Sequence, residues 1–455
     1  MQRLKNTYNT ISGNLERFLY SYAYIALVTL IGAWGFIFKQ EFTAIVIVTV
    51  ILSIQWVFVK DILPSLLGAM ILGMIPLARY GEVDYFLPLF WVLTYVVPAW
   101  IIHMIIYPPK FIKGRFFYPT LAIAISITLG GLFSPYFLDS FKGASLYYLS
   151  FLGFGMVMIY VFVENYLPNR KDAVLYFSKM MLGVGIMGIL MVSSYYYYNW
   201  DDIVNNGGLG RYFQWRNNLS NNLLLSMPFA FYLAYKNKYV HFYYLIGVLQ
   251  FVALVMSFSR GGIIFGTLVF PFLVTTMFIL KPKKSLGFIT ILVLVFGAVY
   301  FMAEEYFDGF MTVINDIRER VQISPDEARA NMLRMAWENF KNYPVFGTGF
   351  GFSTAPHYNP QPMAMYWYHT TIGQIVGSLG LMGIIAYTYQ MMLRGYTLIE
   401  KRTVFNLFVA FSIMGFAGYS MVNVGYFIPL PMVAVVIQIF ILAERNNRFD
   451  KASSN

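Results

Sequence analysis

The sequence predicts an all-α, polytopic integral membrane protein with about 14 transmembrane helices, and three observations support this fold class. The 455 residues are 58% hydrophobic, only 12% charged, and have a mean hydropathy of +0.60. Most of the chain divides into apolar blocks of about 20 residues, the length that crosses a bilayer core of about 30 Å. Short polar loops separate these blocks. This composition excludes a soluble multidomain protein.

The apolar blocks give 12–14 candidate spans, of which the third and eighth are the weakest. They lie near residues 18–38, 42–59, 62–78, 85–107, 116–137, 145–163, 175–198, 219–235, 240–257, 262–280, 285–303, 369–392, 404–421 and 425–443.

The loop cations predict the orientation, because Lys and Arg are retained on the cytoplasmic side of a membrane. With the N-terminus inside, 20 Lys and Arg residues fall in the inside loops and six in the outside loops. This asymmetry indicates an even number of helices, with both termini cytoplasmic. The six outside cations are Lys39, Arg79, Lys142, Arg211, Arg216 and Arg260.

The formal net charge of +11 therefore mainly reflects the Lys and Arg residues of the cytoplasmic loops, and it also attracts the protein to anionic membrane lipids. It does not indicate binding to nucleic acid, because no soluble basic module interleaved with aromatic residues is present. The chain has no cysteine, which excludes disulfides and thiolate metal sites. The first apolar block lacks a small-residue cleavage site and is predicted to be an uncleaved anchor.

One segment, 304–368, is too long and too polar to be a short loop, and it is expected on the extracytoplasmic side. Within it, Ser324-Pro325-Asp326-Glu327 has the residue types of a helix start, and Pro344 ends the pattern. The spacing predicts an amphipathic helix over about 325–342 on the outer membrane surface, either sealing loose backbone or covering a site. Arg329 falls on its apolar side, where a lone charge suggests a binding role.

The outer loop at 207–218 combines three glycines, two arginines and several amides directly before a membrane helix. The guanidinium groups of Arg211 and Arg216 would grip phosphate oxygens in a bidentate fork, which lysine cannot do. The alternative is that these arginines pair with Asp201 or Asp202 at the membrane surface.

Arg260 lies in Ser257-Phe258-Ser259-Arg260-Gly261-Gly262, a connection so short that the arginine must sit at the membrane boundary. An arginine near hydrocarbon costs about 2.5–3.5 kcal/mol on insertion scales, so we expect it to have a partner such as phosphate. The adjacent glycines and helix start expose amides that add affinity for an anion. A snorkelling arginine in an ordinary tight turn is the alternative.

His369 opens an apolar helix at its outer end, on the membrane face predicted for the arginines. With an ordinary pKa near 6.5, it could accept a proton from a hydroxyl at neutral pH. We favour His369 over His357, the rival base in the long loop. The glycine-rich run 347–351 follows no strand and contains no lysine, so it is predicted to be a tight turn and not a nucleotide loop.

These motifs together resemble the O-antigen ligase and Wzy-type polymerase superfamily, over residues 207–390. Ser259-Arg260-Gly261-Gly262 looks like the family's hallmark. The run from Arg329 through Trp337 to Gly349 is similar to its arginine-tryptophan-proline-glycine run. The remaining points of similarity are His369 with Gly380 and Gly383, and Asn217 with Pro228. The chain departs from the family where Arg216 precedes Asn217 and where Thr370 follows the histidine.

The resemblance implies a metal-independent glycosyltransferase without cofactor, in the bacterial cytoplasmic (inner) membrane. The donor would be a glycan on polyprenyl (undecaprenyl) pyrophosphate, and the acceptor a hydroxyl of a glycan or lipid at the outer face. His369 and Arg260 would be catalytic. Arg211, Arg216, Asn217 and Arg329 would bind substrate, with either Arg211 or Arg216 on the pyrophosphate.

Four functions stay open at this point. A surface polysaccharide polymerase is favoured, an O-antigen ligase transferring to a lipid, protein or wall acceptor is the alternative, and a flippase of lipid-linked sugars represents a different class. A peptidoglycan-type glycosyltransferase is a further option, which would need an essential carboxylate in the long segment, such as Asp308, Asp316 or Glu319. The chain is expected to comprise N-terminal helices (1–206), a catalytic region with the large loop (207–392), and C-terminal helices with a cytoplasmic tail (393–455).

Overall fold

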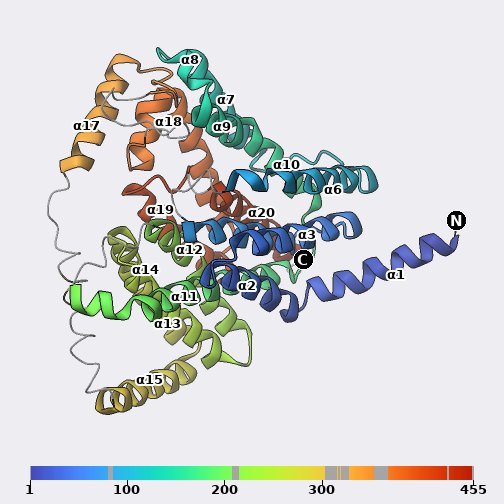
Figure 1. Ribbon diagram of the computed structural model, residues 1–455, viewed down its shortest axis with the longest axis vertical. Coiled ribbons are helices and arrows are strands. Elements are labelled where there is room, and N and C mark those ends of the chain that lie inside the picture. Colours follow the sequence, from blue (N-terminus) through green and yellow to red (C-terminus); the bar gives the residue numbers. More distant parts are fainter. Residues whose placement is uncertain are drawn as a thin grey trace. The chain divides into compact units, whose positions relative to one another are not determined.

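In the computed structural model, helices joined by turns and loops make up the part of the protein that the structure describes (Figure 1). That part comprises residues 2–79, 86–206, 215–302, 315, 318, 327–352, 367–427 and 430–452. No strand occurs among them, which confirms the all-α class. The chain forms two compact units. Unit 1 contains Met1–Pro108, Pro168–Gln322 and Leu407–Phe416, and unit 2 contains Pro109–Leu167, Ile323–Asn406 and Ala417–Asn455.

Seven helical stretches in the described ranges are long and apolar enough to cross a membrane, or eight if one bent pair counts as a span. They support an integral membrane protein, while the total of 14 stays a prediction. Shorter apolar helices account for three further candidate blocks: Ser65–Ala78, Phe117–Leu132 and Val240–Met256. The seven are Glu41–Phe58, Pro88–Ile106, Ser145–Tyr166, Ala173–Asp201, Arg260–Leu280, Thr371–Glu400 and Val404–Met421.

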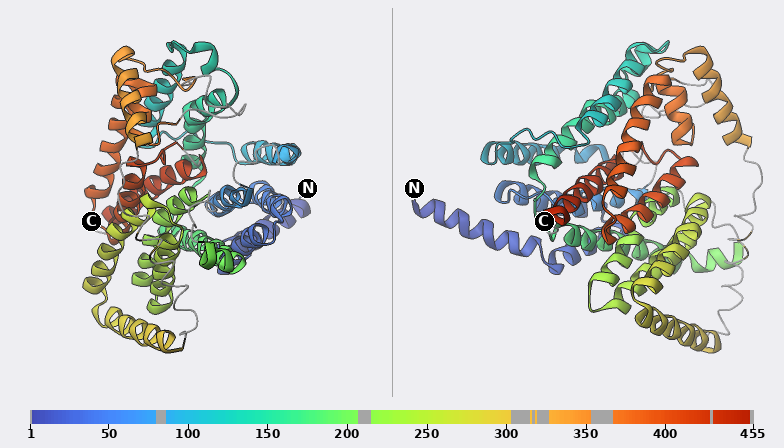
Figure 2. Two further views of the ribbon diagram at one scale, coloured as in Figure 1. Left: turned by 60° about the vertical axis from the view of Figure 1, so that its left-hand side comes forward. Right: turned by 180° about the vertical axis from the view of Figure 1, so that it is seen from behind.

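Unit 1 begins with a helix pair that differs from the single span expected at 18–38. Ser21 adopts an extended conformation and caps a new helix by accepting a hydrogen bond from the Tyr24 N–H at 3.2 Å. The described helical stretches on either side meet at 68°, and Figure 2 shows them from two further directions. The first helices are α1 (Gln2–Leu19), α2 (Tyr22–Ile37), α3 (Glu41–Phe58), α4 (Ser65–Met74), η1 (Ile75–Arg79), η2 (Leu87–Val92) and α6 (Leu93–Ile106).

The remaining helices of unit 1 pack around α12 (Arg216–Lys236). Every residue of α12 from Leu219 to Ala234 is buried, as expected for a helix that is surrounded by neighbours on all sides. The helices α11 (Ala173–Asn206), α13 (Val240–Met256) and α14 (Arg260–Leu280) all contact it. The last helix of this group is α15 (Pro282–Met302).

Three connections that the sequence assigns to the inside meet within unit 1. The Tyr20 hydroxyl donates a hydrogen bond to Asp61, and the Arg170 guanidinium lies 4.3 Å from the centroid of the Tyr20 ring. Arg170 also lies 3.9 Å from Glu16. Their meeting supports placing these connections on the same side of the membrane, and the identity of that side stays a prediction.

Unit 2 contains α7 (Phe117–Leu132), α8 (Phe137–Ser140), α9 (Gly143–Ser150), η3 (Phe151–Gly155), α10 (Met156–Tyr166), α17 (Glu327–Asn342), α18 (Thr371–Glu400) and α20 (Leu430–Ala452). The helix α19 (Val404–Met421) has residues in both units. The amphipathic helix expected in the long segment is confirmed as α17. It packs against α18, and both views of Figure 2 show the two side by side in orange.

The helix α18 is broken at Gly380, where φ is +59° and ψ is −152°. The turn after α17 fills this break, because the Leu381 and Met382 N–H groups donate to the Pro344 and Val345 carbonyls at 2.8 and 3.1 Å. Broken helices are tolerated at membrane depth only where other protein groups satisfy the freed backbone in this way.

The glycine-rich run 347–351 also bonds to α18 near this break. The Thr348 and Gly349 N–H groups donate to the Gly377 and Ser378 carbonyls at 3.0 and 2.9 Å. A Cβ at Gly347 would lie 2.4 Å from the Ser378 carbonyl carbon, so only glycine fits there. The run is a tight turn, as the sequence predicts, and its contacts give it a structural role.

Candidate active site

The turn between α13 and α14 presents Arg260 as the first residue of a helix. Ser259 caps this helix, because its Oγ accepts a hydrogen bond from the Gly262 N–H at 3.3 Å. Arg260 therefore adds its positive charge to the helix end at which the dipole is positive. This combination suits an anionic ligand such as phosphate.

The start of α12 meets this turn within unit 1. The Ser259 hydroxyl donates a hydrogen bond of 3.1 Å to Asn217 Oδ1, and the hydroxyls of Ser220 and Ser257 lie 2.9 Å apart. A Cβ at Gly262 would lie 2.7 Å from Ser220 Oγ, so this glycine permits the close approach. The sequence singles out the segments around Asn217 and around Arg260 separately, and in the structure they are in direct contact.

The arginine side chain is half-buried, and its Nε is buried without a hydrogen-bond partner. Arg216, the first residue of α12, is also half-buried. Arg211 and His357 lie outside the residues that the structure describes.

His369 lies two residues before α18, in unit 2, with an exposed side chain and a backbone φ of +51°. Contacts on both sides hold this conformation. The Tyr368 N–H donates to Gln374 Oε1 at 3.1 Å, and the Thr371 N–H donates to the Asn423 carbonyl at 3.0 Å. The imidazole therefore projects from a fixed backbone.

The helix α17 supports the same region. Asn339 Nδ2 donates a hydrogen bond to the hydroxyl of Tyr368, and a Cβ at Gly377 would lie 3.1 Å from the Ala336 Cα. Arg329, in the first turn of α17, is half-buried. Trp337 is 54% exposed, so part of the predicted apolar face of α17 points outward and is available to lipid.

Positive φ angles mark both candidate segments. Non-glycine residues rarely adopt them, and such strain of about 1–3 kcal/mol clusters at functional sites. The described non-glycine residues with a positive φ are Lys39, Phe111, Phe258 and His369, and two of these four belong to the predicted site motifs.

The structure thus gathers the described candidates into two sets. Arg216, Asn217 and Arg260 lie in unit 1, whereas Arg329 and His369 lie in unit 2. That both sets serve one pocket stays a prediction from the sequence.

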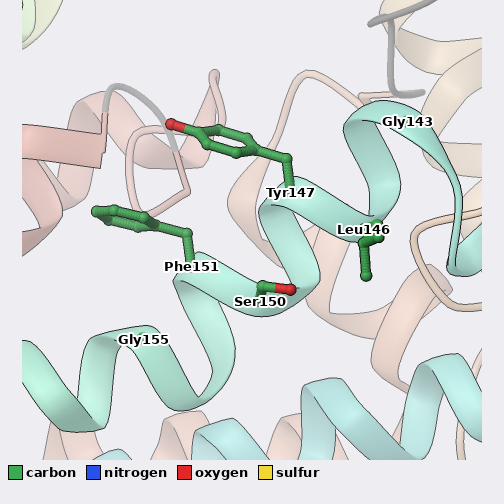
Figure 3. Close-up of a pocket in the computed structure, with 6 residues that line it drawn as sticks. All are labelled: Gly143, Leu146, Tyr147, Ser150, Phe151 and Gly155. Carbon is green, nitrogen blue, oxygen red and sulfur yellow. The ribbon is translucent and has the colours of Figure 1, made fainter. Parts of the chain in front are cut away.

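An open groove of about 500 Å³ lies elsewhere in unit 2, where the π-helical turn η3 bends the chain between α9 and α10 (Figure 3). Its lining is mostly apolar, with Tyr147 and Phe151 on one side and the Ser150 hydroxyl as a polar group. None of the site residues predicted from the sequence lines it. A hydrocarbon chain suits this lining better than a phosphate does.

Sequence reasoning missed two features of the site. The first is the buried amide of Asn221, one helical turn after Asn217. The run of four asparagines in the six residues from Asn217 to Asn222 could have revealed it, because polar side chains inside a membrane helix are usually functional. The second is the strained backbone of Phe258, for which the sequence carries no signal.

The fold and this site define an integral membrane protein with a helix-start arginine suited to an anionic ligand. Residues 245–388 match the family model described as O-antigen ligase, so this region of the chain is similar to that family. The match includes Arg260, Arg329 and His369, whereas Arg216 and Asn217 precede it. The predicted resemblance is confirmed at the level of the family. Comparisons with curated proteins and with solved structures give no match.

Proposed function

We propose that this protein transfers a glycan from a polyprenyl pyrophosphate donor to an acceptor hydroxyl, as a polymerase of a surface polysaccharide. The observation that carries the proposal is Arg260, which begins a capped helix inside the region that matches the O-antigen ligase family. The protein would act at the outer face of the bacterial cytoplasmic membrane, with both termini cytoplasmic.

The proposed chemistry needs two kinds of group. Arg260, with Arg211 or Arg216, holds the pyrophosphate and stabilises the negative charge that develops on it. The acceptor oxygen attacks the anomeric carbon, the bond from that carbon to the pyrophosphate oxygen breaks, and the electron pair leaves with the pyrophosphate. His369 takes the proton from the acceptor hydroxyl, with His357 as the alternative base.

Asn217 and Arg329 are proposed to contact the substrate. Asn217 is supported by its hydrogen bond to Ser259 beside Arg260, and Arg329 by its half-buried place on α17, which packs against the helix that follows His369. Because pyrophosphate is already a good leaving group, the scheme requires no strong acid catalysis, and the resemblance to the O-antigen ligase superfamily implies neither a metal nor a cofactor.

Two other functions predict different products. An O-antigen ligase would use the same donor and move its glycan to a lipid, protein or wall acceptor. A flippase would move the lipid-linked sugar across the membrane with the pyrophosphate bond intact, and would need charged groups at mid-membrane depth.

The deciding experiment incubates the purified protein in lipid nanodiscs with a defined lipid-linked repeat and no other acceptor. A ladder of longer lipid-linked glycans supports the polymerase. If the donor stays unchanged alone but is consumed once a lipid, protein or wall acceptor is added, the result supports the ligase. Unchanged donor with each of these acceptors contradicts glycosyl transfer.

Arg260→Ala and His369→Ala should each abolish the ladder while the protein still inserts in the membrane. Arg334→Ala is the matched control, because this arginine is exposed on α17 and donates to Asn331 of the same helix. Full activity of both site variants would remove the mechanism.

A further inference from the structure

The first turns of α12 are unusually polar for a helix that other helices enclose. Most buried positions in the following part of the helix are apolar, as in Leu223-Leu224-Leu225, but Asn221 and Asn222 carry amides. Asn221 is 1% exposed and Asn222 is 3% exposed. A buried amide is normally hydrogen-bonded, so each one without a partner requires an explanation.

Asn221 has no hydrogen-bond partner from the protein at either amide atom, neither Oδ1 nor Nδ2. Among the Asn and Gln side chains that the structure describes, it alone has both atoms buried and unsatisfied. Asn222 has an unsatisfied Oδ1. Leaving such groups unpaired costs about 1–3 kcal/mol each, a cost that a leucine at position 221 would avoid.

The position of Asn221 on α12 connects it with the candidate site. Residues four apart lie on the same face of a helix, so Asn221 is just over one turn, about 6 Å, along the axis from Asn217. Asn217 accepts the hydrogen bond of Ser259, and Ser220 contacts Ser257 and Gly262. The amide therefore lies on the face of α12 that meets the turn carrying Arg260.

Arg260 has a matching feature, since its Nε is buried without a partner. A cation and a neutral amide at the contact between α12 and this turn are chemically complementary to a sugar pyrophosphate. Guanidinium matches phosphate oxygens, whereas an amide both donates and accepts, as a sugar hydroxyl or acetamido group does.

We propose that Asn221 is a sugar-binding residue, whose amide hydrogen-bonds the donor sugar attached to the pyrophosphate. This inference rests on the proposed function and adds a specificity-determining contact to it. A site built to hydrogen-bond a sugar group discriminates against donors that lack this group, because its buried amide would then stay unpaired.

The test measures binding of two kinds of lipid to the full chain in nanodiscs. One is undecaprenyl pyrophosphate without a sugar. The other is the same lipid carrying glucose, galactose, N-acetylglucosamine or N-acetylgalactosamine. The wild-type protein should bind at least one of the sugar-bearing lipids more tightly than the bare lipid. Asn221→Leu should lose about tenfold in affinity for that lipid and keep its affinity for the bare lipid.

The same variant gives a second readout with the opposite sign. Because leucine removes two unsatisfied polar atoms, Asn221→Leu should raise the unfolding temperature measured without lipid. If the amide of Asn221 only stabilised the fold, its replacement by leucine would lower the unfolding temperature. Asn221→Ala should show the same loss for the sugar-bearing lipid, and it replaces the leucine variant if the larger side chain prevents folding.

Ser226→Ala is the matched control, because this buried hydroxyl deeper in α12 is already bonded to Gln250 at 2.9 Å. It should lower stability and leave the preference for the sugar-bearing lipid unchanged. Equal losses for both lipids in Asn221→Leu, or none, would overturn the inference. A wild-type protein that makes a ladder but gains no affinity from any of the four sugars also overturns it, and leaves the proposed function standing. Absence of glycan transfer with every acceptor would contradict both this inference and the proposed function.

Discussion

The hydroxyl of Ser259 donates a hydrogen bond of 3.1 Å to Asn217 Oδ1 and so joins the start of α12 to the start of α14. The same oxygen accepts the Gly262 N–H at 3.3 Å and caps α14. One side chain thus fixes both the helix that begins with Arg260 and its distance from the upstream segment.

Removing this hydroxyl should affect stability and donor binding together. We expect Ser259→Ala to lower the free energy of unfolding by about 1 kcal/mol, the usual value of an N-cap. We also expect weaker binding of undecaprenyl pyrophosphate, because Arg260 loses its fixed helix start. Thr403→Ala is the control, since Thr403 caps α19 through the Asn406 N–H at 3.1 Å and should cost similar stability without a change in lipid affinity. Equal lipid affinities in both variants would contradict a positioning role for Ser259.

The left-handed backbone of His369 allows its chemistry to be separated from its conformation. Asparagine tolerates this region of φ and ψ, so His369→Asn should keep the unfolding temperature close to that of the wild type. Glycan transfer should fall by about 10²–10⁴-fold, the usual contribution of a general base. Transfer rates and thermal unfolding of the same preparation decide the matter. A rate that falls only in proportion to lost folded protein would speak against catalysis by His369.

The break in α18 should tolerate no side chain. At Gly380 the φ of +59° and contacts of 2.7 Å from a Cβ to the Gly347 nitrogen and the Pro344 oxygen oppose any larger residue. Gly380→Ala should therefore lose more than about 2 kcal/mol, measured by chemical unfolding or as a loss of folded protein.

Gly395 lies in the same helix with nothing within 4 Å of an added Cβ. Gly395→Ala should be neutral or slightly stabilising, because alanine favours a helix by about 1 kcal/mol over glycine. If both alanine variants behaved alike, the turn at 344–349 would not be the element that fills the break.

Asp61 should make stability depend on pH. Burial raises the pKa of this carboxyl from 3.8 to about 6, against the hydrogen bonds from Tyr20 and the Leu63 N–H, which lower it. Between these pH values the folded protein holds a proton that the unfolded chain has released, so stability falls as the pH rises through about 6. The loss is about 3 kcal/mol at most.

Asp61→Asn removes this dependence. Relative to the wild type it should gain stability at pH 7.5 and gain little at pH 4, as measured by thermal unfolding at both values. Asp172→Asn should lose stability at both pH values, because the Arg170 guanidinium holds the pKa of the Asp172 carboxyl below its ordinary value of 3.8, and the stabilisation is lost only as the pH falls below that value. A wild-type minus Asp61→Asn difference that is flat across this range would contradict the argument.

The sequence alone determined the features that depend on neighbouring residues. Apolar length predicts helices such as α3, α14 and α19, because a helix in a membrane satisfies its own backbone hydrogen bonds. The short connection at Arg260 and its glycines predict a helix start there, and the spacing of apolar residues predicts α17. The resemblance to the O-antigen ligase superfamily also rests on short motifs, and the match at residues 245–388 confirms it.

Only the tertiary structure decided which of these local elements meet. The bond between Asn217 and Ser259, the turn that fills the break at Gly380, and the unsatisfied amide of Asn221 all join segments far apart in the sequence or depend on what surrounds a side chain. Hydropathy reports how apolar a residue is but carries no information about its partner. Packing determines whether a buried polar group has a hydrogen-bond partner. The buried groups without one are what distinguishes the candidate site.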